Sequence, residues 1–264
     1  MTLTLHTAST IKAASLALTA PGTRYMGGGT LTVRAANEGD VSVSSLVRST
    51  DPALSAIEIA GGTVTIGASV TMSAIARHTA LAPLHQVANA IGGPAIRNMA
   101  TVGGNMFAPS PYGDFAVALL ALDATVHLGD SDMPIEAFLA GRDTRAKETI
   151  VTAVSFKLAT DTFRFLKVSR VKPRGVSVLS IAAVIEQTGE TVSLARIAFG
   201  SMADRPVRAK AAEQALIGKA LTKDGIAAAL ACAAEGTDAP TDAIASGWYR
   251  TEVLPVHLGR LLMS

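Results

Sequence analysis

Two glycine clusters, about seventy residues apart, are the part of this chain best suited to bind a charged ligand. The first is Gly27-Gly28-Gly29-Thr30, which directly follows Arg24-Tyr25-Met26. The second is Thr101-Val102-Gly103-Gly104-Asn105, and Asp114 follows it. Consecutive glycines leave backbone N–H groups uncovered and permit a positive φ, so such a turn can direct several donors at a phosphate. The pair of loops predicts a two-sided clamp on a dinucleotide. No Gly-Lys-Ser/Thr sequence is present, which disfavours an ATP-binding P-loop.

Composition excludes several classes of protein. The chain has 264 residues, of which 49% are hydrophobic, so it can build a large core. A net charge of +2, the lack of a dense Lys/Arg run and only 4% aromatic residues argue against a nucleic-acid partner. The N-terminus does not read as a signal peptide, and no apolar run approaches the roughly 20 residues of a membrane span. We therefore expect a cytoplasmic protein without a membrane span.

Cysteine and histidine usage argues against a metal centre on this chain. Cys232 is the single cysteine, so neither an intramolecular disulfide nor a Cys-ligated iron–sulfur cluster can form here. We expect Cys232 to be a small buried apolar residue in a reduced compartment. His78 and His85 are too far apart in sequence, without matching carboxylates, to predict a metal site.

Hydrophobic patterning divides the chain into three segments with mixed elements, which indicates an α+β fold. Residues 1–55 read as a small α/β lobe, residues 56–170 as a second lobe, and residues 171–264 as a sheet followed by helices. The expected helices are Ser9–Leu18, Thr71–His78, Pro83–Ala90, Phe115–Leu122, Val207–Ile217, Thr222–Ala234 and Trp248–Met263. The expected strands are Arg24–Met26, Val41–Val43, Ala56–Ile59, Thr63–Gly67, Ala124–Leu128, Thr149–Leu158, Val178–Glu186 and Thr191–Phe199.

These motifs resemble those of the FAD-binding (medium) subunit of the molybdenum hydroxylases, the xanthine dehydrogenase and carbon monoxide dehydrogenase type. The first cluster is similar to the family's Ala-Gly-Gly-Thr loop, and residues 96–105 are similar to its Arg-Asn-x-x-Thr-Ile-Gly-Gly-Asn loop. The runs 110–114 and 118–124 extend the match. Residues 165–170, 213–218 and 248–250 resemble its later segments, so the resemblance covers almost the whole chain.

The resemblance implies an architecture: a two-lobed FAD-binding domain, followed by a small antiparallel sheet with helices. The lobes would be the small α/β lobe, 1–55, and a lobe with an antiparallel sheet, 56–170. Residues 171–264 would form the C-terminal domain. FAD would lie between the lobes.

The resemblance also implies residue roles in cofactor binding, and each role has a simpler structural alternative. Gly27, Gly28, Gly29 and Thr30 would hold the pyrophosphate, flanked by Tyr25, Met26, Leu31 and Thr32; the alternative is an ordinary glycine-rich turn. Thr101, Gly103, Gly104 and Asn105 would form the second wall. Asp114 would bind ribose hydroxyls or serve as a helix N-cap. Lys167 would lie near the flavin ring or be a solvated strand lysine, and Ile91 would contact the isoalloxazine or the core. The role of Arg97 stays open.

The function implied by the resemblance is electron transfer. FAD on this chain would receive electrons from [2Fe–2S] clusters on a small subunit, while a large molybdopterin subunit hydroxylates the substrate. The acceptor would be NAD⁺, oxygen, or a quinone or protein. Two alternatives stay open: a stand-alone FAD-dependent oxidoreductase of the same fold, and a scaffold subunit that has lost FAD. Leu31 stands where the family usually carries a small polar residue, which is the one hint of the latter.

Overall fold

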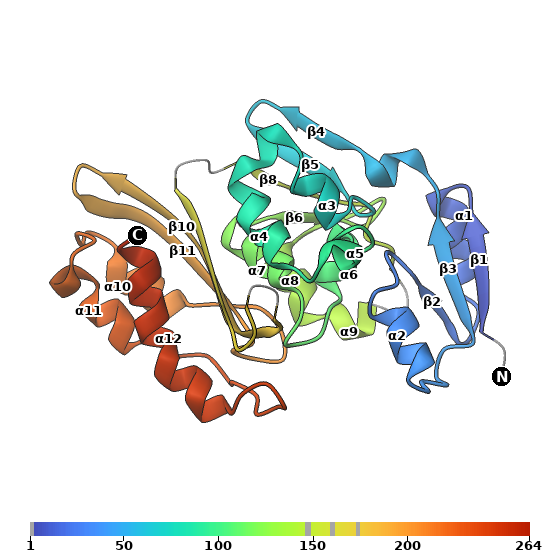
Figure 1. Cartoon of the computed structure of the whole chain (residues 1–264). Coiled ribbons are helices and arrows are strands. Elements are labelled where there is room, and N and C mark those ends of the chain that lie inside the picture. Colours follow the sequence, from blue (N-terminus) through green and yellow to red (C-terminus); the bar gives the residue numbers. More distant parts are fainter. Residues whose placement is uncertain (1–2, 146–148, 159–161, 173–174) are drawn as a thin grey trace.

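The computed structural model describes residues 3–145, 149–158, 162–172 and 175–264. Within these residues, three β-sheets follow one another along the molecule: a three-stranded, a five-stranded and a four-stranded sheet. Figure 1 shows the three-stranded sheet near the N-terminus at the right, the five-stranded sheet in the middle, and the four-stranded sheet with its helices at the left. None of the described helices combines the length and the apolar character that a bilayer crossing requires.

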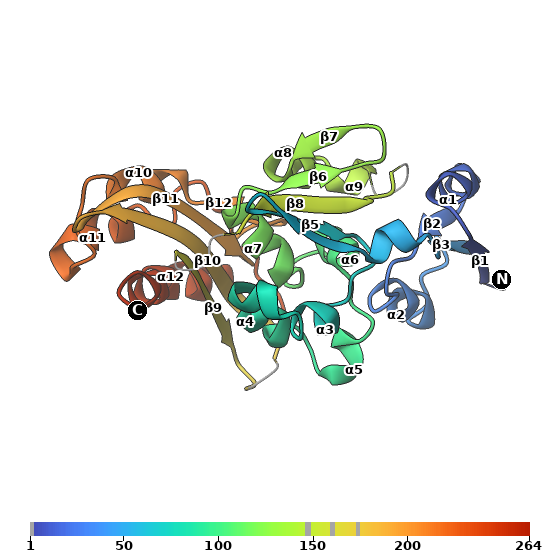
Figure 2. The same ribbon diagram turned by 90° about the horizontal axis from the view of Figure 1, so that it is seen from above.

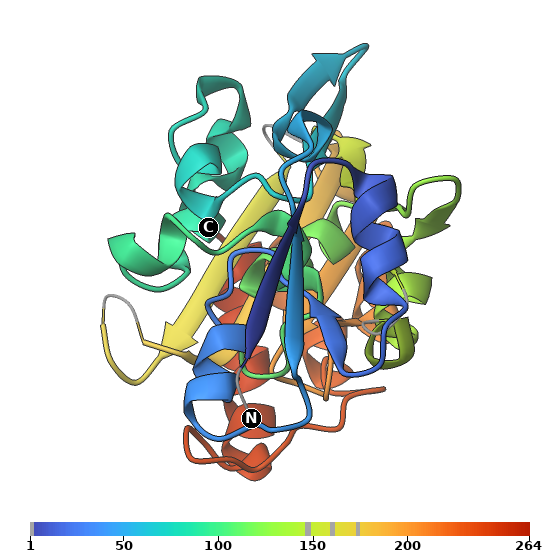
Figure 3. The same ribbon diagram turned by 90° about the vertical axis from the view of Figure 1, so that its right-hand side faces the viewer.

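The N-terminal lobe is a small parallel sheet with the strand order β1-β3-β2. Helix α1 begins after Thr10, whose side chain accepts the N–H of Ala13 at 3.2 Å, and its apolar face packs on the sheet. In Figure 3 the lobe faces the viewer, with α1 and α2 on opposite sides of the sheet. Its elements are β1 (Thr4–Ala8), α1 (Ile11–Leu18), β2 (Thr23–Tyr25), α2 (Thr32–Asn37) and β3 (Ser45–Ser49).

The expected strand at Val41–Val43 was wrong, because the strand forms at β3 instead. Val41 is 81% exposed, whereas Leu46 and Val47 are buried where β3 pairs with both neighbouring strands. The Asp40 side chain accepts the N–H of Ser42 at 2.9 Å, which fixes a turn before the strand. Burial between two strands therefore outweighed the β-propensity of the exposed Val41 and the half-buried Val43.

The middle lobe is an antiparallel sheet with the order β4-β5-β8-β6-β7. The predicted hairpin over residues 56–67 is confirmed, and Val64 and Ile66 point from β5 into the core. Helix α7 is buried along its whole length. The elements are η1 (Pro52–Ser55), β4 (Ile57–Ala60), β5 (Thr63–Gly67), α3 (Met72–Ile75), η2 (Thr79–Leu84), α4 (His85–Ala90), α5 (Pro94–Arg97), α6 (Val102–Met106), α7 (Asp114–Ala121), β6 (Thr125–His127), β7 (Asp132–Pro134), α8 (Ile135–Ala140), α9 (Arg142–Arg145) and β8 (Ala153–Lys157), where η marks a 3₁₀ helix.

The C-terminal part is an antiparallel sheet of order β12-β11-β10-β9 with apolar side chains on both faces. Ala182 and Val184 of β10 belong to the core around α7, whereas Ile181 and Ala183 belong to the core under the C-terminal helices. Figure 2 shows the sheet between α7 on one side and α10 and α12 on the other. The elements are β9 (Phe163–Ser169), β10 (Ser177–Thr188), β11 (Thr191–Gly200), β12 (Val207–Arg208), α10 (Lys210–Leu216), α11 (Lys223–Ala231) and α12 (Gly247–Leu262).

One helix boundary differs from the expected one in this part. Residues Val207 and Arg208 pair with β11, so the helix expected from Val207 begins only at Lys210. Strand β9 pairs along its length with β10, so a boundary between residues 170 and 171 separates β9 from the sheet that it completes. The limits of the three domains stay a prediction.

Candidate functional site

The two glycine loops meet backbone to backbone. A Cβ built on Gly28 would stand 1.6 Å from the carbonyl oxygen of Met99, and one on Gly27 would stand 2.7 Å from Oγ1 of Thr101. The start of the first loop is fixed by the N–H of Met26, which donates to the carbonyl of Val47 at 2.7 Å. At Gly28 only glycine permits this approach, because any side chain would meet main-chain atoms, whereas a Cβ on Gly27 would meet the Thr101 side chain. The predicted proximity of the two loops is therefore present.

The first loop presents free backbone donors. No residue that the structure describes accepts a hydrogen bond from the amides of residues 27–31. Gly29 adopts a positive φ of 73°, which turns the chain into α2. The carbonyl oxygens of Gly29 and Leu31 accept the N–H groups of Val33 and Ala35, which are the first bonds of that helix. Successive free amides in a turn form a concavity that favours an anion.

The second loop uses its amides internally, which corrects the expectation that both loops present donors. The N–H of Gly103 donates to the carbonyl of Ala68 at 2.9 Å, and the N–H of Gly104 donates to Oγ1 of Thr101 at 3.1 Å. Asn105 donates through Nδ2 to the carbonyl of Thr101 at 2.9 Å. A Cβ on Gly103 would lie 3.0 Å from the Cβ of Ala68. These glycines thus allow close packing of α6 rather than supply free donors.

A cleft of about 890 Å³ opens beside the two loops. Every residue expected on either loop lines it except Met26, and Ile91, Asp114 and Lys167 line it as well. The Met26 sulfur instead lies 3.2 Å from the position of a Cβ on Gly29, under the loop. Because the lining comes from all three parts of the chain, the cleft brings together residues that are distant in sequence.

An acid–base pair lies inside the cleft. Nζ of Lys167 is 2.9 Å from Oδ2 of Asp114, and their side chains are only 12% and 7% exposed. Asp114 is the first residue of α7 and the N-cap is Gly113, so the N-cap alternative for Asp114 is wrong. Lys167 is likewise no solvated strand lysine, since its Nζ also donates to the carbonyl of Ala90 at 2.9 Å.

Burial affects the ionisation of one tyrosine in the lining. Desolvation raises the pKa of the Tyr25 phenol above 10.0, although hydrogen bonds involving Ser49 and Ser69 oppose the shift. The phenol therefore stays protonated at neutral pH, where it can act as a hydrogen-bond donor.

Sequence reasoning missed several polar residues that also line the cleft, among them Arg34, Tyr112 and Ser177. Nη1 of Arg34 on α2 donates to the Tyr112 hydroxyl at 3.2 Å, which links the two lobes. The hydroxyl of Ser177 donates to both carboxylate oxygens of Asp114, at 2.7 and 3.0 Å. Tyr112 lies in the run 110–114 and could have been found there, whereas nothing near Ser177 in the sequence indicates its partner.

A second polar cluster lies away from the cleft on the five-stranded sheet. His127 of β6 bonds through Nδ1 to Asp132 at 2.7 Å and through Nε2 to the hydroxyl of Ser155 at 2.8 Å. The chain of contacts from Asp132 through His127 to Ser155 resembles the catalytic triad of a serine hydrolase. None of the three residues lines the main cleft or the smaller pocket of the N-terminal lobe. The contact joins β6, β7 and β8. No group of side chains suited to a metal ion occurs within the described ranges.

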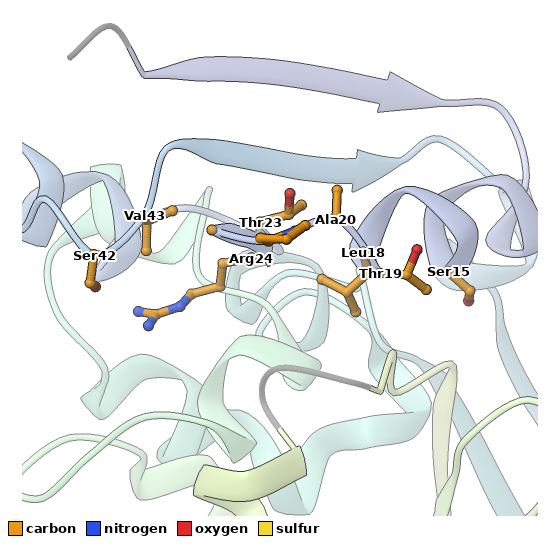
Figure 4. Close-up of a pocket in the computed structure, with 10 residues that line it drawn as sticks. Ser15, Leu18, Thr19, Ala20, Thr23, Arg24, Ser42 and Val43 are labelled. Carbon is orange, nitrogen blue, oxygen red and sulfur yellow. The ribbon is translucent and has the colours of Figure 1, made fainter.

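A smaller pocket of about 540 Å³ lies in the N-terminal lobe (Figure 4). Mostly small residues, such as Thr19, Gly22 and Ser42, line this pocket. Arg24 is its one charged lining residue. Arg24 lines the main cleft too. A single cation without a matched set of polar partners does not define a ligand, so the main cleft is the candidate site.

Comparison with known proteins places the chain in a family. Residues 1–156 match the family described as the FAD binding domain in molybdopterin dehydrogenase, and residues 164–264 match the CO dehydrogenase flavoprotein C-terminal domain. The glyceraldehyde dehydrogenase medium chain of Sulfolobus acidocaldarius is 30% identical over 181 residues, covering 66% of this chain and 64% of that protein. The nicotinate dehydrogenase FAD-subunit of Eubacterium barkeri is 30% identical over 191 residues, with the same coverage. The matched part thus spans about 64% of these relatives' length.

Solved structures agree with the fold. A carbon monoxide dehydrogenase of Hydrogenophaga pseudoflava superposes with a TM-score of 0.90 at 23% identity, covering 99% of this chain and 96% of that one. The quinoline 2-oxidoreductase of Pseudomonas putida 86 gives a TM-score of 0.86 at 22% identity, covering 100% and 95%. Together with the two matched domains, which account for nearly the whole chain, the comparisons confirm the resemblance: the chain belongs to the family of FAD-binding flavoprotein subunits of the molybdopterin dehydrogenases.

Proposed function

We propose that this chain binds FAD in the main cleft and serves as the electron-transfer subunit of a molybdenum-containing hydroxylase. The observation that carries the proposal is the row of free amides over residues 27–31 at the wall of a cleft of about 890 Å³. Such a row suits the two negative charges of a diphosphate. Family membership makes FAD the dinucleotide to expect there.

The residues present fit FAD along the cleft. The first loop would hold the diphosphate, and the second loop would form the wall behind it. Lys167 would place a cation beside the flavin, and Ile91 would supply an apolar contact next to it. When bound, FAD supplies the electron-carrying chemistry, and a nearby cation favours its reduced, more negative form. Leu31 lines the cleft, yet the free amides on the same loop remain, which supports retained binding over a scaffold role.

The partners that we propose are a small subunit with [2Fe–2S] clusters and a large molybdopterin subunit. The single cysteine of the sequence cannot ligate such a cluster by itself, which supports placing the iron on a partner subunit. Burial, with a smaller effect of Glu235, raises the pKa of the Cys232 thiol, which disfavours the thiolate that a metal would require. The acceptor we propose is NAD⁺, oxygen, or a quinone or protein, and the location is cytoplasmic.

A stand-alone flavoenzyme is supported less well. Such an enzyme needs a base that acts on substrate next to the flavin. Of the residues that the structure shows lining the cleft, none is a histidine, and the carboxylates of Glu38, Asp114 and Asp143 each pair with a basic side chain. This chain therefore has the features of an electron relay rather than of the site where substrate is hydroxylated.

Flavin titration tests the binding proposal directly. The isolated chain should bind FAD and bind riboflavin, which lacks the diphosphate, at least about a hundredfold more weakly, since several charge-assisted hydrogen bonds are lost. FMN should fall between them. Equal affinities for FAD and riboflavin, or no detectable FAD affinity in a folded sample, would overturn the proposal.

Co-purification tests the partner proposal. A complex isolated from the native source through this chain should contain flavin, iron and molybdenum in fixed ratios. Flavin alone, with turnover of a substrate by the isolated chain, would support the stand-alone alternative.

A further inference from the structure

The buried carboxylate of Asp114 is held from two sides. The Ser177 hydroxyl donates to Oδ1 at 2.7 Å and to Oδ2 at 3.0 Å, and Lys167 lies 2.9 Å from Oδ2. Ser177 is completely buried, and in the described residues its hydroxyl has no other partner than Asp114. A donor that reaches both oxygens restricts rotation of the carboxylate, which a single contact from Lys167 would leave free.

Lys167 in turn reaches the wall of the cleft. Its ammonium donates to the carbonyl of Ala90, directly before Ile91, at 2.9 Å. The contacts therefore run from Ser177 through Asp114 and Lys167 to the backbone at the end of α4. Ser177 and Lys167 come from paired strands, β10 and β9, but their side chains meet only through Asp114.

We propose that Ser177 is a positioning residue of the cofactor cleft: by fixing the carboxylate of Asp114, it holds the Lys167 ammonium in place beside the bound flavin. The inference deepens the proposed function and rests on it for the part that concerns the flavin. Ser177 stands at the lining of the cleft, but its side chain is completely buried against Asp114, so its effect on bound FAD would pass through Asp114.

A matched control lies on the same strand. Ser180 is completely buried as well, and its hydroxyl is without a hydrogen-bond partner among the described residues. Ser177→Ala and Ser180→Ala therefore make the same chemical change at the same burial on β10, and Ser180, which pairs with Lys167 in the strand register, tests whether losing any hydroxyl near Lys167 is enough. Only the first removes a donor to Asp114.

The first measurement needs no cofactor. In the FAD-free full chain, trace acetylation followed by mass spectrometry reports how firmly the Lys167 amine is held relative to the other lysines. Ser177→Ala should raise the acetylation rate of Lys167 several-fold, because Asp114 is no longer fixed against it, and Ser180→Ala should leave the rate unchanged. An unchanged rate in Ser177→Ala would overturn the positioning role, whether or not the chain binds FAD.

The second measurement uses the FAD-loaded chain and a double-mutant cycle. Ser177→Ala should lower the midpoint potential of the flavin, because the cation that favours the reduced form is no longer held beside it. In a Lys167→Met background the same substitution should change the potential little, since its effect passes through Lys167. An equal shift in both backgrounds, or no shift in either, would contradict the inference. If the chain never takes up FAD, the proposed function is wrong. The acetylation rate of Lys167 would still decide whether Ser177 has the positioning role.

Discussion

The backbone of Gly28 lies against the carbonyl oxygen of Met99, so close that a Cβ on Gly28 would stand 1.6 Å from that oxygen. Gly28 belongs to the N-terminal lobe, and Met99 precedes α6 of the middle lobe. The two lobes therefore meet here through main-chain atoms, with no side chain between them. This contact brings the free amides of the first loop to the edge of the cleft, where a ligand can reach them.

Replacing Gly28 should weaken FAD binding. In Gly28→Ala the new methyl group cannot occupy its place unless the loops separate, which would displace the amides of residues 27–31 at the wall of the cleft. We expect FAD affinity to fall at least about tenfold, which corresponds to about 1.4 kcal/mol, measured by flavin fluorescence titration.

Gly93 provides the matched control for this substitution. A Cβ on Gly93 has no atom within 4 Å, and Gly93 does not adopt a positive φ. Gly93→Ala should therefore bind FAD as the unchanged protein does. Equal FAD affinity in Gly28→Ala would show that the approach of the loops is not needed for binding.

The sequence predicted the loops and most elements, because both depend on local signals. Consecutive glycines, the cap at Thr10 and the hairpin over 56–67 are visible within a few residues. The hydrogen bond of the Gly103 amide was not predictable in this way, because its acceptor, the carbonyl of Ala68, lies 35 positions earlier in the sequence. The Ser177–Asp114 bond joins residues 63 positions apart, and only the pairing of β9 with β10 brings the serine to the cleft.

The hydrogen bond between Arg34 and Tyr112 should slow the dissociation of FAD. The Arg34 guanidinium donates to the Tyr112 hydroxyl at 3.2 Å from the other lobe, and both residues line the cleft. Tyr112→Phe removes only this hydrogen bond, which is exposed and contributes about 1 kcal/mol or less. We expect FAD to dissociate a few-fold faster, as measured by stopped-flow mixing of the FAD-loaded chain with an excess of an unrelated FAD-binding apoprotein that traps the released cofactor. Tyr249→Phe, at an exposed position of α12, is the control and should leave the rate unchanged.

Substitutions of Asp114 and Lys167 should have non-additive effects on the free energy of unfolding of the FAD-free chain. Each side chain is nearly buried, so Asp114→Asn or Lys167→Met leaves one charge without its counter-ion at a cost of about 3 kcal/mol. The double variant removes both charges and should cost clearly less than the two single costs together. Urea unfolding measures the three free energies. Strict additivity would mean that the two groups do not interact in solution.

The stability of the C-terminal part should depend on pH through Asp242 and Arg250. Arg250 is completely buried, and Nη2 lies 2.9 Å from both carboxylate oxygens of Asp242, while Nε donates to the carbonyl of Val178 and Nη1 to that of Pro240. Desolvation opposes ionisation of Asp242, yet hydrogen bonds from the Ala245 and Ile244 amides and from Arg250 together lower its pKa below the ordinary 3.8.

A carboxyl group whose pKa is lowered by folding stabilises the native state above its unfolded pKa, and this contribution is lost as the pH falls through the folded value. Asp242→Asn should therefore lower the free energy of unfolding at neutral pH by about 2 kcal/mol, less than for a fully buried pair because the Asp242 side chain is 29% exposed. The difference between the two proteins should shrink below about pH 4, close to the ordinary pKa of an aspartate. Asp130→Asn, at an exposed turn, is the control for a change of net charge. A difference that stayed constant down to the acid unfolding transition would show that the loss comes from packing rather than from the charge on Asp242.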